Sequence, residues 1–331
     1  MKAILMTRTC PAEGLELHDV PEPTLTEPTQ IKVRLRAAGV NPIDTKIRRS
    51  GLLGPGPLPA ILGCDGAGEV IEVGRAVDRF GIGDRVWFCH GGLGGEQGNY
   101  AELTVLDQRW AAPMPRTLDF AEAAAGPLVL ITAWGMLYDR GRLQAGQTVL
   151  IHAGAGGVGH VALQLAKLRG ARVLTTVGSE ENAALARDWG ADEVINHREE
   201  DFVAEVNRLT GGNGADLVAE MVGSEVFFRS IGCTAHFGDL VTLLDPGPVP
   251  LAEARLRNLR IGFELMLTPQ LHGLVAAREH QVDILRQCGA LIDEGRLSLH
   301  VSEVLPLDQA AEAHRKIEAG HTVGKCVLAI G

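Results

Sequence analysis

A glycine-rich turn constrains what this chain can fold into more than any other feature of its sequence. The apolar segment 148–152 leads into the pattern Gly-x-Gly-x-x-Gly, formed by Gly154, Gly156 and Gly159. Residues 158–169 follow, with apolar side chains at the spacing of one buried helix face. A strand, this turn and a helix, in that order, form the setting in which the pattern binds the pyrophosphate of a dinucleotide.

Each glycine of the turn has a physical task. Gly154 allows the tight turn, Gly156 lets backbone N–H groups approach the pyrophosphate, and Gly159 permits close packing of the helix against the strand. The helix N-terminus presents its partial positive charge to the anion. We therefore predict a dinucleotide site whose turn includes Gly157 and Val158 as well; the alternative is a glycine-rich turn that binds nothing.

The rest of the chain predicts two kinds of architecture, and its 331 residues suffice for two domains. After the turn, predicted strands (172–177, 193–195, 217–220, 240–244) alternate with predicted helices (180–189, 201–210, 225–233). Such alternation implies a doubly wound parallel sheet and an α/β fold. Residues 1–120 instead show short β segments at 3–7, 31–38, 68–73, 85–88 and 100–105. The C-terminal part predicts helices at 279–294 and after Pro306, and strands at 299–304 and 326–330.

The end of the second strand of the parallel sheet bears on which dinucleotide binds. An acidic residue there would accept hydrogen bonds from a free ribose 2′-hydroxyl, but Gly178 and Ser179 carry no carboxylate. This favours NADPH over NADH. Glu180 and Glu181 follow at once and no Arg or Lys occurs before Arg187, which weighs against NADPH. Acids in a first helical turn also stabilise the helix N-terminus, however, and we favour that role for the two glutamates.

The composition excludes several other classes of protein. A net charge of −10 disfavours nonspecific binding to nucleic acid or anionic lipid. Six cysteines without a Cys-x-x-Cys pair are typical of free thiols in a reducing compartment. The longest nearly uncharged stretch, 123–138, contains Gly and Pro and is too short for a bilayer. The N-terminus shows no signal-peptide pattern, so we expect a cytoplasmic protein without a membrane span.

Seven separated motifs extend this picture over nearly the whole chain: Gly39–Thr45, Gly63–Gly68, Gly83–Val86, Pro127–Trp134, Ala153–Gly159, Ile195–Glu200 and Gly324–Lys325. In this order they resemble the medium-chain dehydrogenase/reductase superfamily, specifically its zinc-independent quinone oxidoreductase (zeta-crystallin-like) branch. The resemblance implies a GroES-like, β-rich catalytic domain (1–122 and 268–331), a Rossmann dinucleotide-binding domain (123–267) and a cleft between them. By family analogy it also implies a homodimer, with an edge strand from 255–266.

The resemblance bears directly on zinc. Where the zinc alcohol dehydrogenases of this superfamily carry their catalytic ligands, this chain has Asn41, Cys64 with Asp65, and Leu128. One soft ligand cannot hold Zn²⁺, which needs three protein ligands beside an open position. We therefore expect no zinc. A different metal set, Cys64 and Asp65 with His90, stays open as an alternative.

At the nicotinamide end, the resemblance implies four candidate catalytic residues: Asn41, Asp44, Lys46 and Thr132. It also implies that Asn41, Lys46 and Thr132 contact the cofactor. Lys46 stands where many relatives have Tyr, and it either donates to a developing oxyanion or reaches solvent. Thr132 either places its hydroxyl by the nicotinamide or bonds its own helix backbone. Lys325 either closes over the nicotinamide or is a surface charge.

Towards the adenosine end, the resemblance implies contacts from strand ends and loops: Gly178, Ser179, Asn182, His197, Val222, Gly223, Leu243, Leu244 and Asp245. Asn182 stands where some relatives carry a phosphate-binding Lys, which weakens the prediction of NADPH. His197 either lies near the adenosine phosphate or is an ordinary loop histidine.

The expected chemistry follows from the missing Lewis acid. Without one, nothing obvious in the sequence ionises an alcohol at neutral pH. The prediction is an NADPH-dependent reductase that transfers hydride directly to a quinone or an α,β-unsaturated carbonyl. Two alternatives stay open: a nucleotide-binding redox sensor or scaffold with little turnover, and a narrow-specificity enoyl or haloacrylate-type reductase.

Overall fold

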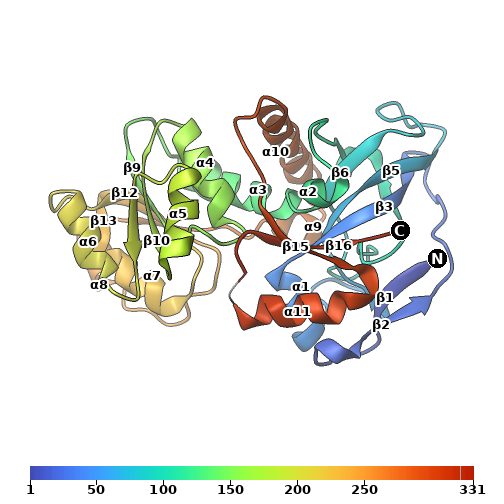
Figure 1. Ribbon diagram of the computed structural model, residues 1–331, viewed down its shortest axis with the longest axis horizontal. Coiled ribbons are helices and arrows are strands. Elements are labelled where there is room, and N and C mark those ends of the chain that lie inside the picture. The colour runs from blue at the N-terminus through green and yellow to red at the C-terminus, as the bar shows by residue number, and fades with distance from the viewer. Residues whose placement is uncertain (321) are drawn as a thin grey trace. The chain divides into compact units, whose positions relative to one another are not determined.

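The computed structural model describes residues 1–320 and 322–331. Two compact units make up the chain (Figure 1): residues 1–128 with 267–331 form the first, and residues 129–266 form the second. The first unit is discontinuous in sequence because strands near the C-terminus join a sheet begun by N-terminal residues. In the described part of the chain, no helix has the length and apolar character needed to cross a membrane.

The second unit is built on one six-stranded sheet in which all neighbours run parallel. Its strands are β9 (Thr148–Ile151), β10 (Arg172–Val177), β11 (Glu193–Asn196), β12 (Ala215–Glu220), β13 (Thr234–Thr242) and β14 (Arg260–Phe263). Their order across the sheet is β11-β10-β9-β12-β13-β14. This is the Rossmann order, so the predicted doubly wound sheet is confirmed.

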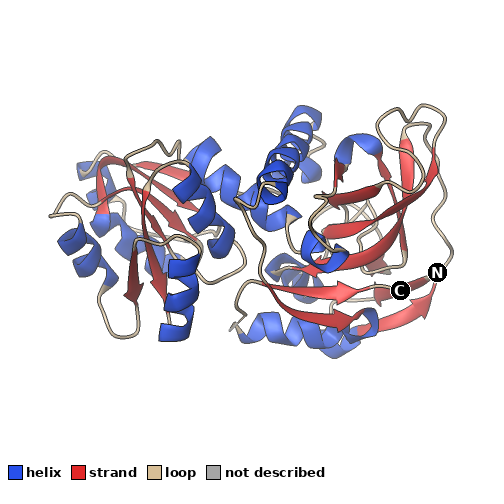
Figure 2. Cartoon of the chain, turned by 45° about the horizontal axis from the view of Figure 1, so that its top comes forward, coloured by secondary structure: helices blue, strands red, loops and turns tan. Residues whose placement is uncertain are grey.

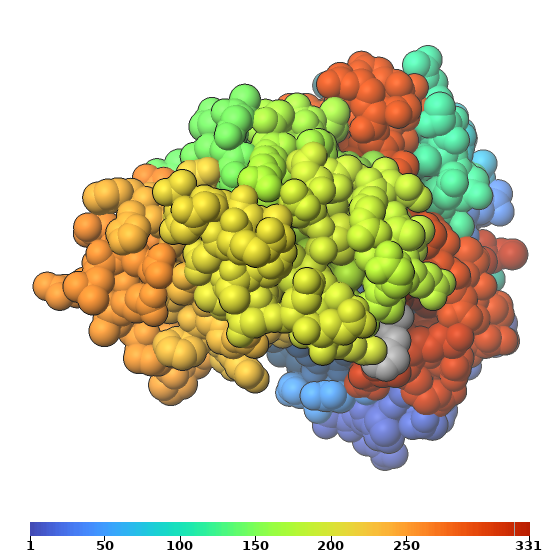
Figure 3. All heavy atoms as spheres, turned by 60° about the vertical axis from the view of Figure 1, so that its left-hand side comes forward, coloured from blue at the N-terminus to red at the C-terminus, as the bar shows by residue number. Residues whose placement is uncertain are grey.

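Helices cover both faces of this sheet (Figure 2), and they are α4 (Gly159–Leu168), α5 (Glu180–Asp188), α6 (Phe202–Leu209), α7 (Ser224–Ser230) and α8 (Ala252–Leu256). In the space-filling view of Figure 3, the yellow and orange surface of this unit belongs to the part of the chain that contains α6 and α8. Because both faces are covered, strand residues such as Leu150, Leu174 and Val218 are fully buried. Each such side chain contributes about 1.5–3 kcal/mol to folding.

The first unit contains two sheets. A seven-stranded sheet has the path β15 (Val301–Pro306), β16 (Lys325–Ala329), β3 (Gln30–Val40), β5 (Asp65–Val73), β6 (Arg85–Cys89) and β8 (Ala112–Pro113), and β7 (Leu103–Asp107) also pairs with β3. A three-stranded sheet has the order β2 (Leu15–Asp19), β1 (Lys2–Met6) and β4 (Ala60–Ile61). The helices are α1 (Pro42–Ser50), α2 (Phe120–Ala124), α9 (Thr268–Leu271), α10 (Val275–Asp293) and α11 (Ala310–Ala319). Antiparallel pairing dominates, which agrees with the predicted β-rich domain.

Three local differences from the sequence-based expectations matter for the site. The strand expected at 240–244 is β13, Thr234–Thr242, so Leu243 and Leu244 lie beyond its end. The strand expected at 100–105 begins only at Leu103, which leaves Tyr100 in a loop. Helix α3 (Pro127–Trp134) continues into a π-helical segment, Gly135–Arg140. Local side-chain patterns do not encode the limits of the two strands, because pairing with neighbouring strands decides where a strand begins and ends.

Candidate functional site

The glycine-rich turn lies between β9 and α4, and its glycines meet different surroundings. A Cβ on Gly154 would lie 2.2 Å from Thr175 Oγ1, and a Cβ on Gly159 would lie 2.2 Å from the carbonyl oxygen of Ala153. Packing therefore requires both glycines. A Cβ on Gly156 would meet only the Ala153 oxygen, at 3.2 Å, and Gly156 itself is partly exposed. The turn is thus open at Gly156, where the predicted pyrophosphate would need backbone N–H groups.

A buried histidine that was not among the predicted site residues is hydrogen-bonded next to the turn. His152 is 1% exposed; its Nδ1 lies 3.1 Å from Thr176 Oγ1 and its Nε2 lies 2.9 Å from Ser230 Oγ. Burial lowers the pKa of His152 to about 3, so the ring is neutral at physiological pH. The same Thr176 hydroxyl accepts a hydrogen bond from the N–H of Ala153, inside the turn. His152 therefore links the turn to β10 and α7.

The carboxyl ends of β10 and β11 bring two predicted residues together and add one that was missed. A Cβ on Gly178 would lie 3.2 Å from His197 Nε2 and 3.4 Å from Arg198 Nε. Ser179 and Asn182 are neighbours at the start of α5, where Ser179 Oγ accepts from the N–H of Asn182 at 3.2 Å. Arg198 places a cation beside Gly178, although no Arg or Lys lies between Gly178 and Arg187 in the sequence. Parallel pairing of β10 with β11 was the available signal, because it brings both strand ends to one edge.

A buried carboxylate organises the loops that follow β12 and β13. Glu220 Oε1 accepts hydrogen bonds from the N–H groups of Val222 at 2.5 Å and Gly223 at 2.7 Å. Its Oε2 accepts one from the Thr242 hydroxyl at 2.6 Å. Glu220 is 0% exposed and was not predicted as a site residue. It joins two strand ends at the carboxyl edge of the sheet.

The loop after β13 carries the remaining predicted residues of this edge. Leu243 donates its N–H to the backbone oxygen of Glu220, and Leu244 donates its N–H to Thr242 Oγ1. Asp245 is exposed and accepts a hydrogen bond from the N–H of Gly247 in a tight turn. Leu243 and Leu244 are therefore tied to the strand ends, while Asp245 faces solvent.

In the first unit, four polar side chains form a buried group that we call the Lys325 cluster: Asn41, Asp44, Asp65 and Lys325, each at most 3% exposed. The Lys325 ammonium donates to Asn41 Oδ1 at 2.5 Å and to the Val40 oxygen at 2.9 Å, and it lies 3.9 Å from Asp65 Oδ2. Asn41 Nδ2 donates to Asp65 Oδ2 at 2.9 Å. The suggestion that Lys325 is a surface charge is wrong, because pairing of β16 with β3 buries this side chain.

Helix α1 explains why Asn41 and Asp44 belong to this cluster while Lys46 does not. Asn41 precedes the helix, Pro42 occupies its first position, and Asp44 accepts the Asn41 N–H at 2.9 Å. This is half of a capping box, and it suits a carboxylate near a helix N-terminus. Lys46 lies on the exposed side of α1. The structure therefore does not bring Lys46 to the cluster.

Burial shifts the pKa values of the three ionisable groups in the cluster. Desolvation, together with the smaller effect of the Asp65 charge, raises the pKa of Asp44 to about 7, although hydrogen bonds from Asn41 and Tyr100 and the Lys325 charge act the other way. Desolvation also raises the pKa of Asp65 and lowers that of Lys325. All three shifts follow from the cost of removing a charge from water.

Thr132 belongs to the second unit. It lies on α3 and is 4% exposed, three residues before the π-helical segment begins. Gly135 starts that segment, and a Cβ there would lie 2.5 Å from the carboxyl carbon of Glu264, which is itself buried. Close packing of Glu264 therefore requires glycine one turn after Thr132.

The donor atoms in the first unit do not fit zinc. Both oxygens of Asp65 accept hydrogen bonds, one from Asn41 Nδ2 and the other from the N–H of Leu128 at 2.8 Å. The Lys325 ammonium already places a positive charge 3.9 Å from Asp65. A hydrogen bond with Cys89 and burial raise the pKa of the Cys64 thiol, whereas zinc binds the thiolate.

The alternative metal set with His90 fits no better. His90 Nδ1 lies 2.9 Å from the guanidinium of Arg278, which also lies over the ring of Trp110. Among residues 1–320 and 322–331, no group of three or more His, Cys, Asp or Glu side chains is placed to hold a metal ion. A catalytic zinc would therefore lack ligands here, and zinc independence stays a prediction about the working protein.

Comparisons with known proteins place the chain in a defined group. A family described as "Alcohol dehydrogenase GroES-like domain" matches residues 27–116, and one described as "Zinc-binding dehydrogenase" matches residues 189–328. A quinone oxidoreductase from Pseudomonas aeruginosa is 37% identical and covers 96% of this chain and 95% of its own length. A 2-haloacrylate reductase from Burkholderia sp is 32% identical, covering 91% of each chain.

Solved structures give the same result. An alcohol dehydrogenase superfamily protein from Novosphingobium aromaticivorans superposes with a TM-score of 0.92 at 34% identity, covering 100% of both chains. The quinone oxidoreductase of Escherichia coli, solved in complex with NADPH, superposes with a TM-score of 0.88 at 31% identity, covering 99% of this chain and 100% of its own.

Proposed function

The chain belongs to the quinone oxidoreductase branch of the medium-chain dehydrogenase/reductase superfamily, and we propose that it reduces quinones or α,β-unsaturated carbonyls with NADPH, without zinc. The observation that carries the proposal is the Lys325 ammonium, buried among the residues that stand where zinc-dependent members have metal ligands. A lysine there offers hydrogen bonds and positive charge to an oxygen. It offers no open metal position at which an alcohol would ionise.

The second unit supplies groups that fit NADPH. The turn is open at Gly156, and the N-terminus of α4 follows it, a combination that suits a pyrophosphate. Arg198 and His197 lie against Gly178, where a 2′-phosphate would find a guanidinium and an imidazole. The E. coli quinone oxidoreductase was solved with NADPH, which supports the choice of cofactor. When bound, NADPH supplies a hydride.

The acceptor we propose is electron-poor. Hydride addition to the conjugate carbon of an enone, or to a quinone, moves negative charge onto an oxygen. Lys325 and Asn41 are the donors of the first unit that can stabilise such a charge, and their burial strengthens that stabilisation. Asp44 and Asp65 hold these donors in place.

The test is the initial rate of NADPH loss with a panel of quinones and enones, with NADH in parallel and a chelator present throughout. Turnover of one acceptor class with NADPH supports the proposal and identifies the acceptor. Activity that disappears with the chelator and returns with zinc overturns the metal-free mechanism. NADPH binding without turnover of any acceptor would favour a redox sensor or scaffold.

One relative favours a second candidate function. Because a 2-haloacrylate reductase is 32% identical over most of both chains, the panel includes a 2-haloacrylate and simple 2-enoates. Turnover confined to these acids would make the protein a narrow-specificity reductase of the enoyl or haloacrylate type. Similar rates with quinones and enones would exclude that narrow specificity.

We also propose that the chain forms a homodimer through β14. This strand lies at one edge of the parallel sheet, where its outer side has no partner strand within the described chain. Phe263 is 58% exposed, and Leu265 just after the strand is 51% exposed. An apolar edge strand of this kind is a natural place for a second copy to pair.

A further inference from the structure

A line of buried polar side chains extends from the Lys325 cluster to the surface of the first unit. Arg48 on α1 is 1% exposed, and His314 on α11 and Tyr100 before β7 are each 0% exposed. The Arg48 guanidinium lies 3.4 Å from His314 Nδ1, and His314 Nε2 lies 3.3 Å from the Tyr100 hydroxyl. Tyr100 donates that hydroxyl to Asp44 Oδ2 at 2.9 Å. Three separate segments of the chain thus meet in one hydrogen-bonded series.

The chemistry of these groups fixes the direction of every hydrogen bond. A guanidinium only donates, so His314 Nδ1 accepts from Arg48. Burial lowers the pKa of His314 to about 3, so the ring is neutral and carries its single proton on Nε2. Nε2 then donates to the Tyr100 oxygen, and Tyr100 donates to Asp44. Each donor faces the next acceptor, from the Arg48 cation to the Asp44 carboxyl.

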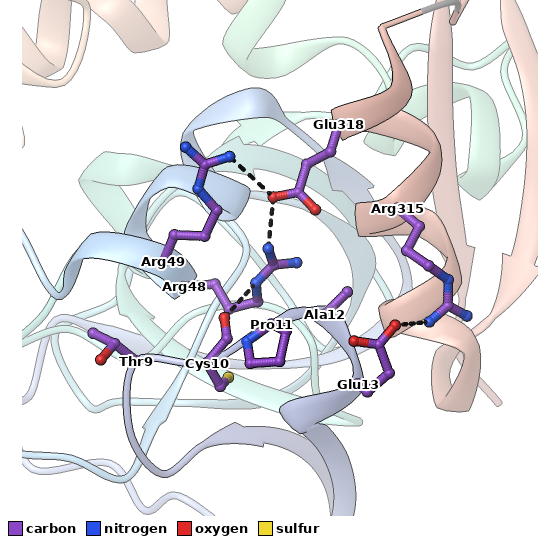
Figure 4. A pocket seen from close by; sticks show the side chains of 9 residues that line it. All are labelled: Thr9, Cys10, Pro11, Ala12, Glu13, Arg48, Arg49, Arg315 and Glu318. Carbon is purple, nitrogen blue, oxygen red and sulfur yellow. Dashed lines mark hydrogen bonds and ion pairs between the residues drawn. The ribbon is translucent and has the colours of Figure 1, made fainter.

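The outer end of the series opens into a pocket of about 650 Å³. Figure 4 shows Arg48 reaching across this pocket, where it donates to Glu318 Oε1 at 2.6 Å and to the Cys10 backbone oxygen at 3.1 Å. Arg49 also faces Glu318, at 3.6 Å. Arg48 is therefore held at three points, and its charge cannot move away from His314.

We propose that Tyr100 and His314 are positioning residues of the reductase, which act through one directed hydrogen-bonded series from Arg48 to keep Asp44 ionised beside Asn41 and Lys325. The inference rests on the proposed function for its kinetic consequence, but the series itself is independent of any substrate. An ionised Asp44 holds the Asn41 backbone, and Asn41 in turn receives the Lys325 ammonium. Protonation of Asp44 would weaken that support.

The groups that face Asp44 determine whether its carboxyl group is ionised or protonated. Tyr100 and the Asn41 N–H donate to its Oδ2, and the Cys64 thiol lies 3.8 Å from its Oδ1. Lys325 stabilises the negative charge and Asp65 opposes it. The Tyr100 hydroxyl makes the shorter side-chain hydrogen bond to Asp44, and it can be removed without changing the formal charge of the cluster.

The first experiment compares Tyr100→Phe with wild type in the pH dependence of kcat/KM for NADPH-driven reduction. Wild-type activity should fall as the pH drops through about 7, where Asp44 takes up a proton. Loss of the Tyr100 hydrogen bond should move this fall to higher pH by about one unit. His314→Leu removes the hydrogen bond from His314 to Tyr100. It should therefore also shift the loss of activity to higher pH, but by less than Tyr100→Phe does.

The matched control is Tyr138→Phe. Tyr138 donates its hydroxyl to the Leu165 backbone oxygen at 2.7 Å in the second unit, so the substitution also deletes one phenol hydrogen bond. Its pH profile should coincide with that of wild type. A profile of Tyr100→Phe that coincides with both overturns the proposal.

A second measurement does not depend on enzymatic activity, and it does not require that a variant of Tyr100 folds. The chain has only two tyrosines, so ¹³C labelling at the tyrosine Cζ gives two NMR signals, assigned with Tyr138→Phe. The Tyr100 signal should titrate between pH 6 and 8 in wild type and lose that titration in Asp44→Asn. A Tyr100 signal that is constant over this range overturns the proposal, even if no acceptor is ever turned over. Titration without any reductase activity would instead reject the proposed function alone.

Discussion

Lys325 donates a hydrogen bond to Asn41 Oδ1 across 2.5 Å, although 284 positions separate the two residues. Antiparallel pairing of β16 with β3 creates this contact, because Cys326 pairs with Val40 and so brings Lys325 beside Asn41. The ammonium is 3% exposed and the Asp65 carboxylate next to it is 0% exposed. Each charge therefore depends on the other, and on Asn41, for compensation.

Lys325→Met should destabilise the protein strongly, because it leaves Asp65 buried without its cation. Loss of one partner of a buried ion pair costs about 3–5 kcal/mol, measurable as the free energy of unfolding in denaturant. Removing both charges in Lys325→Met/Asp65→Asn should restore most of that stability but not the turnover of quinones. If Lys325→Met alone were as stable as wild type, the two charges would not depend on each other.

Arg198→Gln should lower the affinity for NADPH far more than the affinity for NADH. A charge-assisted hydrogen bond to a phosphate contributes about 1.5–3 kcal/mol, so the Kd for NADPH should rise roughly 10- to 100-fold. Titration calorimetry with both cofactors measures the effect. Arg187→Gln is the control, because Arg187 pairs with Glu180 on the exposed side of α5. Equal losses for both cofactors would place Arg198 away from a 2′-phosphate.

Gly156→Ala should separate cofactor binding from folding. The added Cβ would meet only the Ala153 oxygen at 3.2 Å, so thermal unfolding should change little. The methyl group would occupy the open side of the turn, so NADPH binding should weaken at least tenfold. Gly154→Ala offers the contrast, because its Cβ would lie 2.2 Å from Thr175 Oγ1 and should lower the Tm itself. Unchanged NADPH binding in Gly156→Ala would argue against a pyrophosphate at this turn.

His152 should make the protein less stable in acid. Burial lowers its folded-state pKa to about 3, from an ordinary value of 6.5 in the unfolded chain. The unfolded state therefore takes up the proton first, and stability present above pH 6.5 is lost as the pH falls towards 3. Between pH 7 and 5 this amounts to about 2 kcal/mol per histidine.

The corresponding experiment measures the free energy of unfolding of His152→Asn at pH 7 and pH 5. The variant should be less stable than wild type at pH 7 but should lose less stability on acidification. His236→Asn, at an exposed position of the same unit, serves as control and should follow wild type. His90 and His314, whose pKa values burial also lowers, add to the acid sensitivity of wild type. Parallel curves for wild type and His152→Asn would contradict the prediction.

Phe263→Glu should convert a dimer into a monomer, because it places a carboxylate on the outer strand β14. Phe263 is 58% exposed in the single chain, so stability of the monomer should change by less than about 0.5 kcal/mol. Sedimentation equilibrium gives the mass. Ile82→Glu removes a similarly exposed apolar side chain, 71% exposed, from a turn of the first unit and should leave the mass unchanged. A wild-type chain that sediments as a monomer would end the proposal.

Local sequence patterns were enough to predict the Rossmann unit, but not the Lys325 cluster. Gly154, Gly156 and Gly159 act within one turn, so their spacing alone reveals the strand, the turn and the helix. Lys325 and His314 carry no such pattern. The local sequence around a lysine at the start of a strand does not show whether its side chain is exposed or buried. Only the pairing of β16 with β3 decides that Lys325 is buried.

Arg198 and Glu220 show a second limit of sequence reasoning. Arg198 follows His197 directly in a motif already recognised, yet its relevance depends on which strand lies beside β10. Glu220 ends β12 like any other polar residue. Two of its three hydrogen bonds come from the loop that follows it, but the one from the Thr242 hydroxyl exists only because β13 is adjacent. Both residues become visible once the order of the strands is known.

The position of β16 between β15 and β3 also bears on how the chain folds during synthesis. Residues 129–266 form a contiguous unit that can complete its sheet while the ribosome is still translating the rest. The first unit has to wait, because β3 gains its neighbour β16 only when residues 325–329 have left the exit tunnel. Until then Asn41 and Asp65 lack their lysine, and a stalled or truncated chain would expose an unfinished sheet edge to chaperones and proteases.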